Sequence, residues 1–287
     1  MNSPLLQLAA GCIISGLGSL MVATIDMGIY AIAFWRLFIA AVIFLLIMLF
    51  GKFPFPKYKQ TFFYAALAGI LGAVDLMLWH VSIHAIGPGI ATLLNSLQVF
   101  FLALIGLFFF RESLSKIQTI SILVAVVGIA LVVWPEIGLS QEITLGLVTG
   151  LLSALAFALS MLSIRSATVQ EKMPIFGIMF LIDFVGMLFT LPFAIYFDAQ
   201  RFFPAVSLDW LNILAYGAVM QCLAWFLISK SISHVRLAIV GLLMLAQPTT
   251  ALLGDGLFLH RVLDSVQYAG ILLTMVAIYF GSKRHGA

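Results

Sequence analysis

The chain has 287 residues, of which 63% are hydrophobic and only 9% are charged. Because soluble domains carry a charge on roughly a quarter of their residues, this composition excludes a water-soluble globule and predicts a protein whose solvent is lipid. The 14 basic residues are scattered and leave a net charge of +3, which argues against a nucleic-acid-binding protein. The two cysteines, Cys12 and Cys222, lie far apart inside apolar runs, so neither a disulfide framework nor a CxxC motif is expected.

Ten apolar runs, bounded by charges, proline or glycine, follow one another along the chain. Each approaches the roughly 20 residues that a helix needs to cross a bilayer, and none shows the alternation of a transmembrane strand. We therefore expect an all-α polytopic membrane protein with ten transmembrane helices. In chain order the runs are Leu5–Thr24, Tyr30–Leu49, Thr61–Val81, Pro88–Phe110, Ile117–Trp134, Thr144–Ile164, Ile175–Tyr196, Leu211–Ile228, Leu237–Leu259 and Val266–Gly281. The first run lacks a basic stretch and a cleavage site, so it is predicted as a span and not as a signal peptide.

The distribution of Lys and Arg between alternate connections predicts the orientation of the chain, because these residues concentrate in cytoplasmic loops. One set of connections holds eleven of the 14 basic residues, the other holds two, and Arg36 lies inside the second run. The eleven are Lys52, Lys57, Lys59, Arg111, Lys116, Arg165, Lys172, Lys230, Arg236, Lys283 and Arg284, and the two are Arg201 and Arg261. We expect a multi-pass protein of the cell inner (plasma) membrane with both termini in the cytoplasm.

The two halves of the chain match each other at an offset of 149 residues. The identical pairs are Gln98 with Gln247, Leu114 with Leu263, and Gln118 with Gln267. Five spans per half is an odd number, so the second half must enter the membrane in the opposite orientation. This predicts two inverted five-helix repeats, residues 1–136 and 137–287, a design of secondary transporters in which the substrate site lies near the midplane.

Three stretches of the first half carry a family resemblance. They are Trp79–Ile83 (WHVSI), Gly87–Leu94 (GPGIATLL) and Phe108–Leu114 (FFFRESL), and a more diverged copy spans Ala238–Gly281. These stretches resemble the EamA domain of the drug/metabolite transporter superfamily, and the resemblance covers nearly the whole chain. It implies ten spans in two repeats and, most often, export.

The chain departs from the family pattern at some motif positions. The family usually carries a proline in the middle of the fourth helix of each repeat and a Gly-Glu pair at its end. Here Pro248 and Glu112 keep one element each, Val99 stands at the first proline position, and His260-Arg261 replaces the second Gly-Glu. No binding residue of a particular family member is carried over.

Polar side chains near the middle of the runs are the candidate substrate-binding residues, because polar groups inside a membrane are costly unless they face protein or water. Asn95 and Gln98 share one face of the fourth run, and Gln247 is the repeat partner of Gln98. Gln221 and Ser160 lie in the eighth and sixth runs. Amides can satisfy both an ammonium and a carboxylate, so the set suits a polar or zwitterionic substrate. The alternative is that they only hydrogen-bond between helices.

Three ionisable residues are candidates for coupling or gating. Arg36 and Asp75 both fall toward the outer half, where they are expected to neutralise each other. Alternatively, Asp75 carries a proton, or Arg36 binds a substrate carboxylate. Asp183 lies in the inner half without a basic neighbour in sequence, as a proton-coupling acid or a water-facing acid near the cytoplasmic mouth. Asp255 is expected to snorkel to the interface, toward Arg261.

Pro248 completes the coupling and gating candidates. It removes a backbone donor and frees the carbonyl of Met244, which predicts a kink that serves as a hinge or a substrate ligand, or a kink used only in packing. Small residues at spacings such as Ala65/Gly69 predict that the third run packs closely against other helices.

Aromatic and histidine side chains form a further group of candidates. His80 shares a helix face with His84, but the missing third ligand predicts no metal site, and His80 is expected to line the outer cavity. Trp79 beside it is a candidate for substrate binding or for the aromatic belt at the interface. The belt is also expected to include Trp35, Trp210 and Tyr216, whereas Trp225 is a candidate for an aromatic wall.

These observations predict a secondary transporter that exports a small polar metabolite, such as an amino acid, by alternating access. No cofactor, metal or nucleic-acid partner is expected, and the protein is predicted to be a monomer or homodimer in the lipid bilayer. Efflux of hydrophobic cationic drugs is the alternative, ranked second because no compensating acid lies at the predicted centre. A non-transporting accessory subunit is another alternative. The absence of GxSxG, HExxH or a compact Ser/His/Asp arrangement argues against an enzyme.

Overall fold

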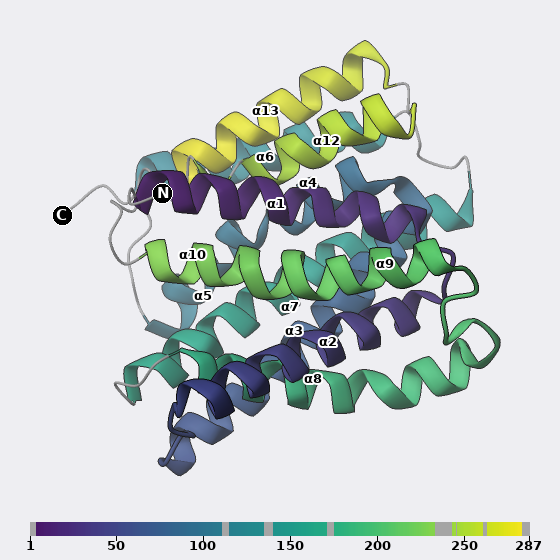
Figure 1. Cartoon of the computed structure of the whole chain (residues 1–287). Helices are drawn as coiled ribbons and strands as arrows, with labels where there is room; N and C mark the ends of the chain where they lie inside the picture. Colours follow the sequence, from purple (N-terminus) through teal and green to yellow (C-terminus); the bar gives the residue numbers. More distant parts are fainter. Residues whose placement is uncertain are drawn as a thin grey trace.

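A computed structural model describes residues 4–110, 115–134, 140–170, 175–232, 243–244, 246–260 and 263–282. The described residues form helices that run roughly side by side, and the start of α1 lies at the same end of the bundle as the end of α13 (Figure 1). The elements are α1 (Pro4–Thr24), α2 (Ile29–Gly51), α3 (Lys59–Ile86), α4 (Pro88–Asn95), α5 (Gln98–Phe110), α6 (Lys116–Val133), α7 (Gln141–Gln170), α8 (Phe176–Phe197), the 3₁₀ turn η2 (Ala199–Arg201), α9 (Ser207–Ala215), the π-helix η3 (Tyr216–Leu223), α10 (Ala224–Ile232), α12 (Ala246–Phe258) and α13 (Ser265–Ser282).

The all-helical prediction is confirmed for the described residues. The helices coincide with the predicted runs, although α3 and α7 each extend several residues beyond them. By length and composition, six helices in the described ranges can cross a membrane, and three shorter apolar helices accompany them. Ten crossings therefore stay a prediction, and residues 237–242 and 245 of the ninth run lie outside the described part.

Two predicted runs are not single α-helices. The fourth run is interrupted at Ser96 and Leu97, which separate α4 from α5. The eighth run consists of α9, η3 and α10, so a π-helical segment lies between two α-helical ones. Breaks and π-segments of this kind place backbone and side chains where a regular helix cannot.

Local sequence signals explain where two of the helices begin. Gly87 has φ of 83°, a backbone conformation that glycine adopts without strain, and Pro88 follows as the first residue of α4. Proline suits that position because the first turn of a helix needs no backbone donor. Ser115 caps α6 in a reciprocal box with Gln118. The chain therefore turns at Gly87, directly before α4 begins.

The packing brings distant parts of the chain together. α3 packs against α7 and α8, α2 packs against α8, and α1 packs against α10 and α12. α6 and α13 form a pair at one edge of the bundle, whereas α8 lies at the opposite edge (Figure 1). At the crossing of α3 and α8, a Cβ atom added to Gly69 would lie 2.5 Å from the carbonyl oxygen of Ile182. The close approach predicted from the small residues of this helix is therefore confirmed for α3.

Gly69→Ala is expected to destabilise the protein, because the new methyl group meets backbone that no side-chain rotation can move aside. Overpacking of this kind costs about 1–3 kcal/mol. The temperature of half unfolding in detergent should fall for this variant. Gly256→Ala is the matched control, since a Cβ there meets nothing within 4 Å. Equal unfolding temperatures for the two variants would contradict the packing at the crossing.

The connection after α8 holds the start of α2. The Oδ2 atom of Asp198 accepts hydrogen bonds from the backbone N–H groups of Tyr30 at 2.6 Å and Ala31 at 2.9 Å. A carboxylate at this position satisfies donors that the first turn of a helix leaves unpaired, and it also interacts favourably with the helix dipole. Asp198 therefore caps α2 from the other half of the chain.

Further contacts surround this cap. Arg201 forms an ion pair with Asp26, and the indole Nε1 of Trp35 donates to the carbonyl oxygen of Phe202 at 2.8 Å. We call these contacts, together with the Asp198 cap, the clasp. The clasp joins residues of the first half to residues of the second half at the end of the bundle where α2 begins.

Asp198→Ala is expected to lower the free energy of unfolding by about 0.5–2 kcal/mol, the usual cost of losing a helix cap. Asp198→Asn should retain most of the stability, because an asparagine oxygen accepts the same backbone bonds. Thermal unfolding of both variants in detergent tests the cap. If alanine and asparagine were equally stable at this position, the capping role of Asp198 would be refuted.

Candidate functional site

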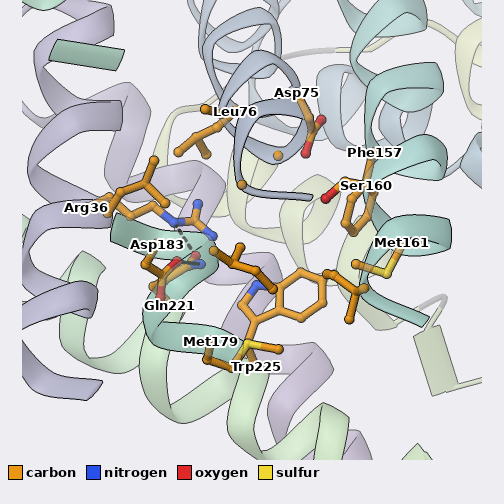
Figure 2. A pocket seen from close by; sticks show the side chains of 16 residues that line it. Arg36, Asp75, Leu76, Phe157, Ser160, Met161, Met179, Asp183, Gln221 and Trp225 are labelled. Carbon is orange, nitrogen blue, oxygen red and sulfur yellow. Dashed lines mark hydrogen bonds between the residues drawn. The ribbon is translucent and has the colours of Figure 1, made fainter. Parts of the chain in front are cut away.

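A cavity lies between α2, α3, α7, α8 and the segment formed by η3 and α10. The volume of the cavity is about 80 Å³, which is room for several water molecules. Its polar lining residues are Arg36, Asp75, Ser160, Asp183 and Gln221. Its apolar wall includes Phe157, Met161, Met179 and Trp225 (Figure 2). One cation, two acids and an apolar wall therefore meet in one cavity.

Arg36 on α2 is the cation of this cavity. Its Nε atom donates to Oε1 of Gln221 at 2.7 Å, and Nη1 donates to the hydroxyl of Tyr216. The guanidinium carbon also lies 4.5 Å from the centre of the Tyr216 ring. The Nη2 atom has no hydrogen-bond partner among the described residues. The guanidinium is therefore held through two of its nitrogens and retains free donors at the third, Nη2.

The expected ion pair between Arg36 and Asp75 is wrong, since these two described residues make no ion pair within the 4.0 Å limit. Arg36 bonds to residues of the eighth run, and the Oδ1 atom of Asp75 accepts a bond from the side-chain amide of Asn95 at 2.8 Å. The physical reason is geometric: α2 and α3 face different neighbours, so each charge finds a neutral polar partner there.

Gln221 links the cation to one of the acids. Its Nε2 atom donates to Oδ1 of Asp183 at 2.9 Å, while its Oε1 accepts from Arg36 (Figure 2). Asp183 is buried, and its Oδ2 atom has no partner in the described structure. Asp183 is thus buried and is not a water-facing acid at the cytoplasmic mouth, while its proton-coupling role stays a prediction. Its cationic neighbour comes from a distant span through one amide.

Tyr216 and His80 lie directly behind Arg36. Tyr216 is 0% exposed, so its predicted place in the interfacial belt is wrong. His80 is also 0% exposed, and its Nε2 atom lies 2.9 Å from the Tyr216 hydroxyl. His80 was expected to line the outer cavity, but it reaches the cavity described here only through Tyr216 and Arg36.

The π-helix η3 explains how Tyr216 and Gln221 both reach Arg36. In an α-helix, side chains five residues apart point about 140° away from each other. In a π-helix the backbone bonds join residues five apart, which brings the two side chains to the same side of the element. This π-segment is what sequence periodicity could not reveal, because the prediction assumed a regular helix.

Asp75 is supported from α4 and α7. The side-chain nitrogen of Asn95 donates to Asp75 and also to the hydroxyl of Ser153 at 3.0 Å. Asn95 is the last residue of α4, at the break before α5. Ser160 lines the cavity but donates its hydroxyl to the carbonyl of Ala68 at 2.9 Å. Of the predicted amides, Gln221 therefore lines the cavity, whereas Asn95 only contacts the lining residue Asp75.

Four other candidates lie away from the residues that line this cavity. Within the described residues, the buried Oε1 atom of Gln98 and the buried indole nitrogen of Trp79 have no hydrogen-bond partner. Gln247 belongs to α12, and its Nε2 atom lies 4.0 Å from Sγ of Cys12 on α1. Pro248 is buried as the third residue of α12. The structure does not bring Gln98 and Gln247 to the cavity as a symmetric pair, and the roles of these four stay predictions.

The predicted kink at Pro248 depends partly on residues 233–242 and 245, which lie outside the described part. The expected snorkelling of Asp255 is wrong, because its carboxylate is buried and accepts a bond from the backbone N–H of Gly89 at 3.1 Å. Arg261, its expected partner, lies outside the described residues. Asp255 instead contacts the first turn of α4, where a negative charge is favourable.

The apolar wall is built around two aromatic rings. Phe157 on α7 and Trp225 on α10 meet edge to face, with ring centroids 5.7 Å apart. Met161 and Met179 lie beside them in the lining. In the view of Figure 2, Arg36, Gln221 and Asp183 lie on one side of the cavity, and Phe157 and Met161 lie on the other. Within the described ranges, no group of three His, Cys, Asp or Glu residues can hold a metal ion.

Comparison with known proteins assigns the chain to a family. It matches the EamA-like transporter family over residues 2–134 and 144–282, which is most of its length. The chain belongs to the EamA-like transporter family. This family consists of membrane transporters, so the resemblance predicted from the sequence motifs is confirmed.

The relatives of this EamA-like transporter carry no assigned substrate. The uncharacterized transporter YetK of Bacillus subtilis (strain 168) is 26% identical over 191 residues, 65% of this chain and 57% of YetK. The uncharacterized transporter YxxF of the same organism is 25% identical over 182 residues, 60% of this chain and 57% of YxxF. The chain thus aligns with just over half the length of each relative.

A solved crystal structure has the same fold as this EamA-like transporter. The two superimpose with a TM-score of 0.69, and the match covers 97% of this chain and 96% of the other. The sequences are only 13% identical, so this likeness shows the fold alone.

Proposed function

We propose that this transporter exports a small zwitterionic metabolite, such as an amino acid, by alternating access. The observation that carries the proposal is the row of Arg36, Gln221 and Asp183 along one wall of the cavity. In the described part of the chain, Arg36 has free donors at Nη2 and Asp183 has a free acceptor at Oδ2. A substrate with a carboxylate and an ammonium satisfies both.

The carboxylate of the substrate is assigned to Arg36. A guanidinium presents a planar fork that matches a carboxylate, and such bonds are stronger when both partners are charged. The ammonium is assigned to Asp183, with Asp75 as the second acid in the cavity. A bound zwitterion adds no net charge to a buried site, which limits the electrostatic cost of moving it through the bilayer.

The apolar side of the cavity is assigned to the substrate's own side chain. Phe157, Trp225 and two methionines offer aromatic and polarizable surface there. Methionine adapts its shape to irregular partners, so the wall accepts apolar side chains of more than one form.

The packing supports two five-helix repeats, residues 1–136 and 137–287, as the moving halves. Exchanging the helices of one half for those of the other, in order, converts the contact of α3 with α7 into that of α1 with α10. It converts the contact of α4 with α7 into that of α1 with α12, and it leaves the pairs α2 with α8 and α6 with α13 unchanged. A pattern of this kind favours rocking of one half against the other around a central site.

The direction of access is proposed from the clasp and the Lys and Arg distribution. That distribution places the start of α2, and hence the clasp, on the outer side. The cavity extends away from the clasp, to Met179 near the start of α8 and Ile164 near the end of α7. These observations support the proposal of a state closed toward the outside, with both termini in the cytoplasm and the protein in the inner membrane.

Efflux of cationic drugs is the second candidate. The sequence alone ranks it second, because it predicts no acid at the centre of the helix bundle. In the structure, however, Asp75 and Asp183 both line the cavity. Two acids beside an aromatic wall suit an organic cation. Arg36 in the same space argues for the zwitterion, since it repels a bare cation.

Counterflow into proteoliposomes tests the proposal. Labelled neutral amino acids and organic cations are offered with and without a pH gradient, and empty liposomes are the control. Saturable exchange of an amino acid is expected, and accumulation driven by the gradient would indicate proton coupling through Asp75 or Asp183. Exchange of cations alone would establish drug efflux, and exchange of neither would refute the proposed substrate classes.

A further inference from the structure

The side chains of Tyr216 and His80 form a buried chain that leads away from the proposed substrate site. Nη1 of Arg36 donates to the Tyr216 hydroxyl, and that hydroxyl lies 2.9 Å from Nε2 of His80. Nδ1 of His80 lies 3.2 Å from the carbonyl oxygen of Ile29. Neither Tyr216 nor His80 is among the residues that line the cavity. Among the described residues, Tyr216 and His80 are therefore connected to the proposed substrate site through Arg36.

The direction of each hydrogen bond follows from elementary chemistry. The carbonyl oxygen of Ile29 can only accept, so Nδ1 of His80 carries a hydrogen and donates a hydrogen bond to that oxygen. In the neutral ring Nε2 is then the acceptor, and the Tyr216 hydroxyl donates to it. The hydroxyl oxygen is left to accept from Arg36. Each group in this row has one direction that satisfies its neighbours.

We propose that Tyr216 and His80 are positioning residues that orient Arg36 toward the substrate carboxylate. Gln221 holds Nε and Tyr216 holds Nη1, so bonds at two of the three nitrogens fix the plane of the guanidinium. Nη2 is thereby presented to the cavity. His80 maintains the orientation of the Tyr216 hydroxyl, and Ile29 at the start of α2 maintains that of His80. This inference rests on the proposed function, because it assumes a substrate with a carboxylate.

Tyr216→Phe tests the first link. The ring under the guanidinium remains, and only the hydroxyl is lost. The KM for a transported amino acid is expected to rise about tenfold, the effect of one hydrogen bond to a charged group. The inhibition constant of the matching amine, which lacks the carboxylate, should stay unchanged. A purely structural role for Tyr216 would alter both values together. Tyr268→Phe, at an exposed tyrosine, is the matched control.

His80→Gln and His80→Leu test the second link. The glutamine amide oxygen can accept from the Tyr216 hydroxyl as Nε2 does, whereas leucine cannot. The KM for the amino acid is therefore expected to remain close to wild type in His80→Gln and to rise several-fold in His80→Leu. Thermal unfolding of the purified variants shows whether the protein is folded.

The outcomes separate this inference from the proposed function. If the wild-type protein exchanges no amino acid, the proposed function fails first. If the wild type exchanges amino acids, equal changes of KM for the amino acid and of inhibition by the amine in Tyr216→Phe overturn the positioning role. Should the amine inhibit neither protein, the histidine variants decide, and an equal KM in wild type, His80→Gln and His80→Leu overturns it.

Discussion

Arg36→Ala is expected to remove most amino-acid exchange, with kcat/KM falling at least about 30-fold. Truncating one partner of a buried, hydrogen-bonded charge pair costs about 2–5 kcal/mol, and each 1.4 kcal/mol corresponds to about tenfold. Arg36 is the one cation among the described residues that line the cavity. Without it the substrate carboxylate would lie beside Asp75 and Asp183 with no compensating charge. Initial rates of counterflow in proteoliposomes measure the loss.

Two companion variants make the Arg36 result decisive. Arg36→Lys keeps the positive charge but cannot bond Gln221, Tyr216 and a substrate carboxylate in one plane, so it should retain only a small part of the activity. Arg165→Ala removes an exposed arginine near the end of α7, outside the cavity, and should leave exchange unchanged. Normal exchange by a folded Arg36→Ala protein would disprove the assignment of the substrate carboxylate to this residue.

Asp183→Asn is expected to weaken amino-acid binding about 10- to 100-fold, because a bond between a carboxylate and an ammonium is worth about 1.5–3 kcal/mol. Asparagine has the same shape, and its oxygen can still accept from Gln221, so the row along the wall is preserved. What the substitution removes is the negative charge at the free oxygen Oδ2. The KM of counterflow measures the change.

An N-acetylated amino acid provides the internal comparison for Asp183. It keeps the carboxylate and lacks the ammonium, so its inhibition of exchange should be no weaker in Asp183→Asn than in wild type. Asp209→Asn is the matched control, because Asp209 is buried in α9 but does not line the cavity. If Asp183→Asn weakened the acetylated compound as strongly as the amino acid, the contact with the ammonium would be ruled out.

The candidate site was predictable only in part. Six candidates were chosen from the sequence because polar groups inside an apolar run are costly. All of them line the cavity: Arg36, Asp75, Ser160, Asp183, Gln221 and Trp225. Their partners were not predictable. Asp75 was expected beside Arg36, but it is bonded to Asn95, and Asp183 is linked to Arg36 through Gln221.

The sequence by itself determined that this protein lies in a membrane, that it is helical and to which family it belongs. These properties are local. A bilayer requires long apolar segments with satisfied backbone bonds, and the motif around Gly87-Pro88-Gly89 indicates the family from consecutive residues alone. The close approach of helices at Gly69 was likewise implied by small residues at regular spacing. Properties that reside in consecutive residues could be predicted because the covalent chain itself keeps those residues together.

Only the tertiary structure decided which side chains meet. The rotation of each helix about its axis is set by its packing against segments far away in sequence, and no local pattern encodes it. The π-helix shows this most clearly, since it brings Tyr216 and Gln221 onto the same side, where a regular helix would separate them. A tyrosine that sequence assigned to the membrane interface is therefore fully buried against Arg36. The candidate site follows from that packing, because both groups that hold the guanidinium come from the other half of the chain.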